Sequence, residues 1–314
     1  MLVGQLFPAL LALALFGHQG ALGTGVAYVA VVAVAQWLLG WANLMAPARG
    51  LRLQTIQISH FAEKVRWLLD LEGVRYTEEV DVGILGVLCT ARTVPVLSHG
   101  AHRLMIGDSP QIVAYLAGSR PSSRLLEQSV HAQELCASFD AMGSAIQRSM
   151  YARLLGGRGF DTHREAALML WGSHPQFASL TPLWQRLLLR LSWPLVLLFM
   201  RRLFKLSSAD AIRSSDQLIS DTFSRVSALL ADGRAFLLGG DSPSVADVTF
   251  CALAGALLLP PEYGGRDSAI LYETAQKLPN IISFVDMHRA TPSAKWVLEF
   301  YRTWRFKKME PSSN

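Results

Sequence analysis

Three short stretches of the sequence carry side chains suited to binding and activating a small charged ligand. The first is Ser59 to Arg66 (SHFAEKVR), the second Thr93 to Leu97 (TVPVL) and the third Ile106 to Pro110 (IGDSP). Each motif is short and carries little information alone. Their order and spacing are typical of loops that converge at one end of a small sheet. There they would meet a peptide that carries a thiol and a carboxylate.

Ser59 stands where a predicted strand, residues 51–58, turns into a helix with apolar residues at helical spacing over residues 61–69. A hydroxyl at this place can donate to a thiolate held beyond the helix N-terminus. The partial positive charge of that terminus, roughly half a unit, also favours the anion. Both effects lower a thiol pKa, and the thiolate is the nucleophile. Serine is also a common N-cap without further function, and the two interpretations are compatible.

The residues that follow Ser59 limit which thiol reactions are possible at this position. Ser59 and Ala62 have the spacing of a CxxC pair, but neither is cysteine, so dithiol exchange or a mixed disulfide at this site is excluded. His60 is either an assisting group or a surface residue. Lys64 and Arg66 are expected to be exposed helix positions.

The second and third motifs predict backbone features. Val94-Pro95 is predicted to be a cis peptide bond, although only about 5% of X-Pro bonds are cis in folded proteins. A cis bond would direct the backbone of Val94 toward a cysteinyl group. Ser109 and Pro110 predict a helix start, with Ser109 as N-cap, where a carboxylate can bind while Asp108 accepts from an ammonium group. The alternatives are a trans proline in a plain loop and a helix cap without a ligand.

Two regions position these residues. Residues 49–118 predict the order strand, helix, strand, short helix, hairpin and helix, which is that of a thioredoxin-like domain. Residues 124–305 are predicted to be helical nearly throughout, and Ser244 to Asp247 form a capping box that opens an apolar helix. A tail of residues 306–314 follows. The predicted fold class is an α+β thioredoxin-like domain followed by an all-α domain.

The first 48 residues differ from the rest of the chain. Residues 1–48 contain no Asp, Glu, Lys or Arg, and residues 24–45 are long enough to cross a bilayer, which needs about 20 apolar residues. A transmembrane helix or hairpin is predicted, with a cleaved signal peptide as the alternative. No basic residue precedes the first apolar run, whereas Arg49 and Arg52 follow the segment. The predicted location is therefore a membrane, with the following domains in the cytoplasm.

Residues 184–206 form a second unusual segment, with five cations and no carboxylate around an apolar stretch, Leu195 to Met200, that is too short to span a membrane. It is either a basic helix on a membrane surface or an ordinary helix with an arginine-rich exposed side. The net charge of +5 fits an anionic membrane, so membrane lipid is a predicted partner. Nucleic-acid binding is not predicted, because no motif for it is present. His99 and His102 lack nearby ligands, so no metal is predicted.

The motifs resemble the glutathione S-transferase family over roughly residues 51–305. Residues 59–76 look like its first helix and second strand, TVPVL like its cis-proline strand and IGDSPQIVAYL like its γ-glutamyl motif. FLLGGDSPSVADVTFCALAG looks like its capping-box helix, and LLPPEYG and VLEFYRTWR like the tail of bacterial-type members. The resemblance implies glutathione as co-substrate, with Ser59 at the thiol-activating position and a binding site that includes His60, Phe61, Val94, Pro95, Asp108 and Ser109.

The function implied by the resemblance is conjugation of the glutathione thiolate to electrophilic small molecules. Residues 83–89 (GILGVLC) are mostly apolar where the family usually has polar contacts to the glycine end of glutathione. A non-catalytic binding or scaffolding protein at a membrane is therefore one alternative. A glutathione-dependent isomerase or dehalogenase is another. Family members commonly pair, so a homodimer is implied as an option.

Overall fold

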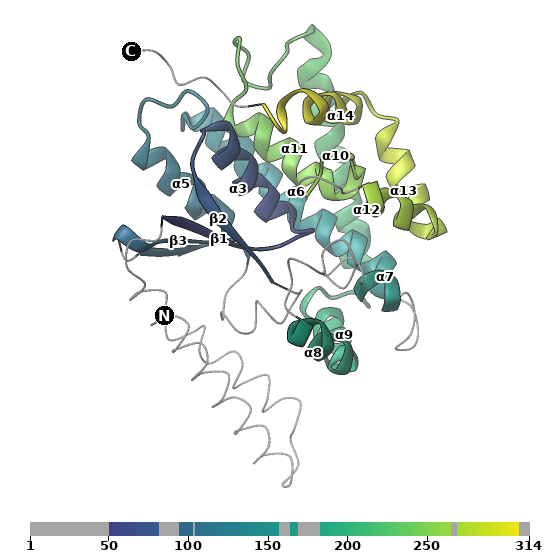
Figure 1. Cartoon of the computed structure of the whole chain (residues 1–314). Helices are drawn as coiled ribbons and strands as arrows, with labels where there is room; N and C mark the ends of the chain where they lie inside the picture. Colours follow the sequence, from purple (N-terminus) through teal and green to yellow (C-terminus); the bar gives the residue numbers. More distant parts are fainter. Residues whose placement is uncertain are drawn as a thin grey trace.

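The computed structural model describes residues 50–81, 94–102, 104–156, 164–168, 183–264 and 269–307. They form a small sheet with helices, followed by a region of helices (Figure 1). The sheet has the strand order β2-β1-β3-β4; β1 pairs with β2 in parallel, and the β1–β3 and β3–β4 pairs are antiparallel. The strands are β1 (Leu51–Ile56), β2 (Tyr76–Asp81), β3 (Val96–His99) and β4 (Leu104–Gly107). A 3-10 turn, η1 (Gly100–His102), joins β3 and β4.

Two helices of the sheet domain, residues 49–118, cover one face of the sheet. They are α3 (His60–Leu71) and α5 (Ser109–Ser119), and they also contact each other (Figure 1). On the apolar side predicted for α3, Val65, Leu68 and Leu69 are fully buried, and Phe61 at its start is half-buried. Gly73, with φ of 62°, follows the end of α3 in the left-handed conformation that glycine adopts at little cost. The short helix predicted between β2 and Pro95 lies outside the described residues.

The helical domain, residues 124–305, is built around one apolar helix, α11 (Val245–Leu258), which contacts α3, α6, α13 and α14. The predicted capping box is confirmed, because Ser244 N–H donates to the Asp247 carboxylate while Asp247 N–H donates to the Ser244 hydroxyl. All side chains of α11 except Ala256 are buried. The other helices are α6 (Val130–Leu155), α7 (Arg164–Leu168), α8 (Leu183–Leu191), α9 (Trp193–Leu203), α10 (Ala209–Leu229), α12 (Ala269–Gln276), α13 (Pro279–Arg289) and α14 (Pro292–Trp304), with a 3-10 turn, η4 (Leu230–Asp232), after α10.

The basic segment of residues 184–206 is two helices and not one. The chain turns at Ser192, between α8 and α9, and Pro194 stands in the first turn of α9, where its missing N–H costs no helix hydrogen bond. No helix among the described residues is long and apolar enough to cross a bilayer. The predicted membrane segment, residues 1–48, lies outside that part of the chain, as do most of the 306–314 tail and the 83–89 stretch.

Candidate functional site

Ser59 lies in the turn between β1 and α3. Its N–H donates to the carbonyl of Ile56 at 2.9 Å, so β1 ends two residues earlier than the predicted Ile58. The Ser59 hydroxyl caps α3 by accepting from Ala62 N–H at 3.3 Å. A hydroxyl that accepts in this way keeps its own proton for a second partner. The local sequence therefore provides both an N-cap and one O–H donor at the positive end of α3.

The Val94-Pro95 bond is cis, as predicted. The Pro95 carbonyl accepts from Asp108 N–H at 3.2 Å, which ties the start of β3 to the start of α5. Val94 is half-buried and borders the same cavity as Ser59. The first and second sequence motifs therefore meet in space, and the third is joined to the second through the backbone.

The start of α5 differs by one residue from the prediction. Asp108 occupies the N-cap position with φ of 74°, Ser109 is the first helical residue, and Pro110 is the second. Asp108 makes no side-chain capping bond, so its carboxylate is available beside the helix start. Ser109 is fully buried, and among the described residues its hydroxyl has no hydrogen-bond partner. An unpaired hydroxyl beside the positive end of a helix is suited to a carboxylate.

His60 is buried, so the surface interpretation is wrong. Its Nε2 lies 3.0 Å from the Gly143 carbonyl of α6, and since a carbonyl only accepts, Nε2 carries the proton and Nδ1 does not. Burial lowers the pKa of His60 to about 4, against a smaller opposing effect of the Gly143 bond, and keeps the ring neutral at pH 7. Phe61 is half-buried, and its ring packs on His60 with the ring centroids 4.3 Å apart.

A cavity of about 130 Å³ lies between the two domains at Ser59. The sheet domain contributes Ile56, Ile58, Ser59, His60 and Val94 to its wall. The remaining wall is mostly apolar and comes from α6, the end of α11, α12, the start of α13 and the loops beside them. The lining residues from the helical domain include Ile146, Met150, Tyr151, Leu154, Ala256, Leu259, Tyr263, Ala275, Leu278 and Ile281.

Tyr263 is a site residue that the sequence did not single out. It is buried, and its hydroxyl donates to the Ile58 carbonyl, next to Ser59, at 2.6 Å. The neighbouring Gly264 accepts at its carbonyl from the side-chain amide of Gln57. The sequence signal was the pair of prolines before Tyr263, which ends α11 and sends the chain back to the β1–α3 turn. This loop fixes the position of the turn that carries Ser59.

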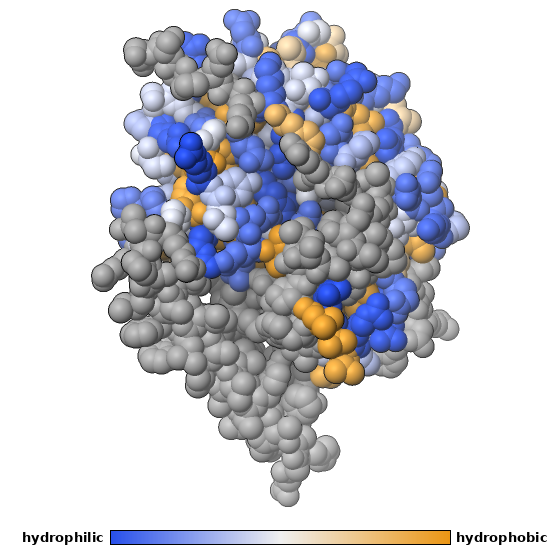
Figure 2. Space-filling model, viewed as in Figure 1, coloured by the Kyte–Doolittle hydropathy of each residue, from blue (hydrophilic) through white to orange (hydrophobic). Residues whose placement is uncertain are grey.

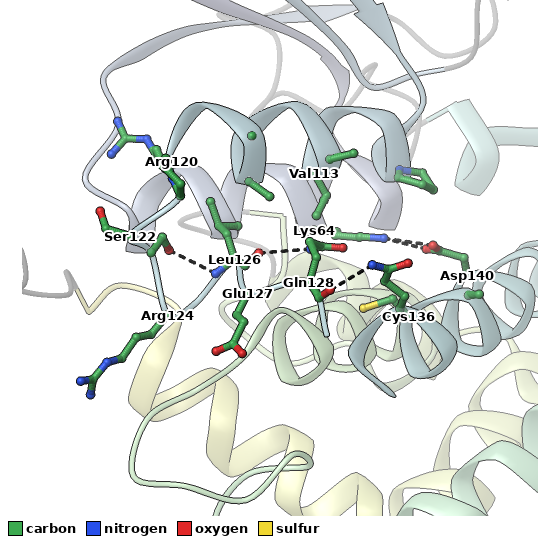
Figure 3. A pocket seen from close by; sticks show the side chains of 18 residues that line it. Lys64, Val113, Arg120, Ser122, Arg124, Leu126, Glu127, Gln128, Cys136 and Asp140 are labelled. Atoms are coloured by element: carbon green, nitrogen blue, oxygen red, sulfur yellow. Dashed lines mark hydrogen bonds and ion pairs between the residues drawn. The ribbon is translucent and has the colours of Figure 1, made fainter. Parts of the chain in front are cut away.

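A larger groove of about 730 Å³ runs from Pro110 of α5 along the first half of α6. Figure 3 shows Lys64 pointing at Asp140 across α3 and α6, while Arg120 and Arg124 lie toward the other end of the groove. The Lys64 ammonium is 2.8 Å from the Asp140 carboxylate. Unlike the small cavity, this groove has charged side chains in its lining, and it reaches the start of α5 at Pro110. They are Lys64, Arg120, Arg124, Glu127 and Asp140.

Ion pairs hold α3 between the two domains, which corrects the expectation that Lys64 and Arg66 are exposed. Their side chains are only 2% and 3% exposed. Arg66 pairs with Glu63 at 3.2 Å and with Glu78 at 2.6 Å. Burial alone would lower the pKa of Arg66, but these carboxylates raise it, so the guanidinium stays charged. The polar side of α3 thus faces the helical domain and the edge of the sheet, not water.

The two cysteines of the described residues are not nucleophiles. Burial raises the pKa of the Cys136 thiol, and it raises that of the fully buried Cys251 well above its usual value. Neither is a thiolate near neutral pH. Within the part of the chain that the structure describes, no cysteine can therefore supply a sulfur nucleophile at Ser59.

Comparison with known proteins agrees with this geometry. Residues 53–124 match the family model of the glutathione S-transferase N-terminal domain. The thioredoxin-like sheet followed by helices fits the fold of that class of protein. No curated protein matches the sequence.

Three of the solved structures that are similar to this chain are the following. A glutathione S-transferase from Methylobacterium radiotolerans, in complex with glutathione sulfonate, has 16% identity and a TM-score of 0.44, over 85% of this chain and 98% of that one. A glutathione S-transferase from Ceriporiopsis subvermispora, in complex with glutathione, has 18% identity and a TM-score of 0.46, over 84% and 100%. The beta-etherase LigF from Sphingobium has 17% identity and a TM-score of 0.41, over 80% and 99%.

Proposed function

We propose that this protein is a glutathione transferase that joins the glutathione thiolate to electrophilic small molecules. The observation that carries the proposal is the cavity in which Ser59 and Val94 of the sheet domain face an apolar wall from the helical domain. The match of residues 53–124 to the glutathione S-transferase N-terminal domain supports glutathione as the thiol. The thiols of Cys136 and Cys251, the cysteines that the structure describes, have pKa values raised by burial and stay protonated, which supports a nucleophile that arrives with the ligand.

Glutathione is proposed to bind where the three sequence motifs, at Ser59, Val94 and Asp108, meet in the sheet domain. The backbone of Val94 pairs with the cysteinyl residue, because Val94 lines the same cavity as Ser59. The γ-glutamyl carboxylate binds at the start of α5, where the Ser109 hydroxyl lacks a protein partner. The carboxylate of Asp108 accepts from the γ-glutamyl ammonium group. His60, Phe61 and Pro95 complete the proposed site, because they directly follow Ser59 and Val94 in the chain and help to fix their positions.

At the sulfur, the Ser59 hydroxyl donates to the thiolate, and the N-terminus of α3 adds its positive potential. Both interactions favour the anion, so the thiol loses its proton to solvent at a lower pH. The thiolate then attacks the electrophilic carbon held against the apolar wall, the S–C bond forms, and the leaving group departs with its electron pair. The apolar wall excludes water from the sulfur, which strengthens the hydrogen bond from Ser59.

The decisive experiment compares Ser59→Ala with Ser208→Ala in the full chain. Ser208 caps α10 in the same way, by accepting from Ala211 N–H at 3.3 Å, and it is not part of the cavity. Each substitution removes one N-cap worth about 1 kcal/mol of stability. Ser59→Ala alone also removes a hydrogen bond to a charged group, worth about 1.5–3 kcal/mol, which is about a 10- to 150-fold loss of turnover.

The assay is the glutathione-dependent conversion of a chromogenic electrophile, with glutathione affinity measured in parallel by calorimetry. Ser59→Ala should lose turnover, keep most of its affinity and show a higher pKa for the bound thiol. Ser208→Ala should resemble the unaltered protein in all three measurements. Full activity of Ser59→Ala, or no binding of glutathione by the unaltered chain, would contradict the proposal. No observation on the described residues favours the non-catalytic, isomerase or dehalogenase alternatives.

Membrane attachment through residues 1–48 is part of the proposal on sequence grounds alone, because this stretch is charge-free and long enough to cross a bilayer. Arg49 and Arg52 favour a cytoplasmic transferase domain. Alkaline carbonate extraction of membranes from cells that express the full chain tests the attachment. Retention in the membrane pellet is the expected result, and full release would exclude an inserted segment.

A further inference from the structure

The described residues expose apolar surface that is concentrated on α8 and α9. Ten large apolar side chains are exposed in this part of the chain, and six of them lie between Leu183 and Leu203. Figure 2 shows this apolar surface at the end of the helical domain that carries α8 and α9, beside strongly hydrophilic residues. The six are Leu183, Leu187, Leu191, Leu195, Leu198 and Leu203, with exposed fractions from 37% to 81%.

These leucines form one face of each helix. On α8, Leu183, Leu187 and Leu191 are separated by four residues each, which places them in a row along one side. The opposite side of α8 is anchored, because Leu189 is fully buried. On α9, Val196 is likewise buried, and the helix contacts α6 and α8. Both helices therefore pack one apolar side against the rest of the helical domain and leave a second apolar side exposed. Surface helices of soluble domains rarely expose an apolar side of this kind.

Positive charge surrounds the exposed leucines. Residues 183–206 contain five cations and no carboxylate. Two of the arginines have protein partners: Arg190 pairs with Glu165 of α7 at 3.3 Å, and Arg201 donates to the Leu155 carbonyl at 2.9 Å. Arg202 and Lys205 are exposed at the end of α9. Residues 183–206 thus combine exposed leucines with cations and contain no carboxylate of their own, which makes them complementary to a partner that is apolar and anionic.

Two observations decide which partner this is. A second copy of the same surface would bring its cations against each other across a two-fold axis, with no carboxylate in either segment to pair them. A bilayer with anionic headgroups offers apolar chains and negative charge in adjacent layers. The charge-free residues 1–48 of the same chain also suit a lipid environment. Because the apolar stretch from Leu195 to Met200 is too short to span, the helices would lie parallel to the surface.

We propose that α8 and α9 lie flat on an anionic phospholipid bilayer, with their exposed leucines below the headgroups and Arg202 and Lys205 at the phosphates. This contact orients the helical domain against the membrane. It is independent of the transferase reaction, and it is independent of whether residues 1–48 cross the bilayer.

The first test reads the surroundings of one leucine in the full chain. Leu187→Cys is labelled with an environment-sensitive fluorophore, in a background where Cys89 and Cys136 are replaced by serine and the fully buried Cys251 is kept. The matched control is Leu218→Cys, an exposed leucine of α10. With vesicles of phosphatidylcholine and phosphatidylglycerol, the label at residue 187 should brighten about twofold or more and shift to shorter wavelength, as for burial at the acyl boundary. The label at residue 218 should not change.

The second test reverses the two exposed positive charges at the end of α9. Arg202→Glu with Lys205→Glu, in the Leu187-labelled chain, should raise the phosphatidylglycerol vesicle concentration needed for half of the response about 25-fold or more, since each cation near an anionic surface contributes about fivefold. Arg302→Glu with Lys295→Glu reverses two exposed cations of α14 and should leave the response unchanged. The reading at residue 187 is local, so attachment through residues 1–48 alone does not produce it.

Four results would overturn the proposal. The label at residue 187 could fail to respond, or residue 218 could respond equally. The response could be the same on pure phosphatidylcholine vesicles and insensitive to the Arg202 and Lys205 reversal, which would exclude anionic headgroups. The label could already be in an apolar environment without vesicles, which would mean that another part of the chain or a second copy covers the leucines.

Discussion

Arg305 is the charged residue whose replacement should most weaken the contact between the sheet domain and the helical domain. Arg305 is 2% exposed and follows α14, yet its guanidinium reaches α3 of the sheet domain. It donates to Glu63 at 2.6 Å and to Asp70 at 2.8 Å, and Glu63 is fully buried. Burial alone would lower the pKa of Arg305, but these carboxylates raise it above its usual value, so the guanidinium stays charged.

In Arg305→Met the methionine fills part of the space, but Glu63 keeps only Arg66 as a charged partner, at 3.2 Å. Removing one member of a buried pair costs about 3–5 kcal/mol, because the remaining charge stays out of water without compensation. The matched control is Arg302→Met, one turn earlier on α14, where an arginine that is 73% exposed pairs with Glu299. Exposed pairs of this kind contribute about 0–0.5 kcal/mol.

The assay is equilibrium unfolding in urea, followed by tryptophan fluorescence, since Trp67 Nε1 donates to the Trp304 carbonyl at the same domain boundary. A transition in two steps for Arg305→Met would show that the domains have separated. In the double variant Glu63→Gln with Arg305→Met the uncompensated charge is gone, so part of the lost stability should return. Equal stability of Arg305→Met and Arg302→Met would refute the argument that burial makes this network important.

Two further pairs of substitutions, one of histidines and one of glycines, test the burial and packing of residues in both domains. Because the pKa of His60 is lowered to about 4, only the unfolded chain takes up this proton between about pH 6.5 and pH 4, so stability should fall by about 3 kcal/mol as pH drops through that window. His60→Gln should remove this part of the pH dependence in urea unfolding, and the same change at the exposed His131 should not. Gly255→Ala places a Cβ at 2.3 Å from the buried Tyr301 hydroxyl and should lower the melting temperature markedly. Gly118→Ala meets no atom within 4 Å in α5 and should stabilise the protein by about 0.4–1 kcal/mol.

The features predicted correctly from the sequence are those that local residues determine. The apolar side of α3, the capping box at Ser244 and the glycine at the end of α3 each depend on side chains within a few positions. The cis bond before Pro95 depends on the fold, and its prediction rested on the motifs on either side. Local sequence patterns were therefore sufficient to predict the elements of the sheet domain and the three motifs that meet at its site.

The errors arose where distant parts of the chain decide the environment. Lys64 and His60 look like surface residues on an amphipathic helix, but α6 supplies Asp140 and Gly143 about 80 positions later and covers them. Periodicity alone cannot show that a helix is packed on more than one side. The start of α5 was one residue off, because Asp108 adopts a positive φ that its sequence permits but does not require.

The packing of α11 limits how the cavity can change. Thirteen of its fourteen residues are buried in the core, and only Ala256 combines partial exposure with a place in the cavity wall. A larger residue elsewhere on this helix would disturb the core of the whole helical domain before it altered the choice of electrophile. If the cavity binds an electrophile as proposed, engineering of its preference should therefore concentrate on position 256 and on the half-buried lining residues of α6, Gln147, Met150 and Tyr151.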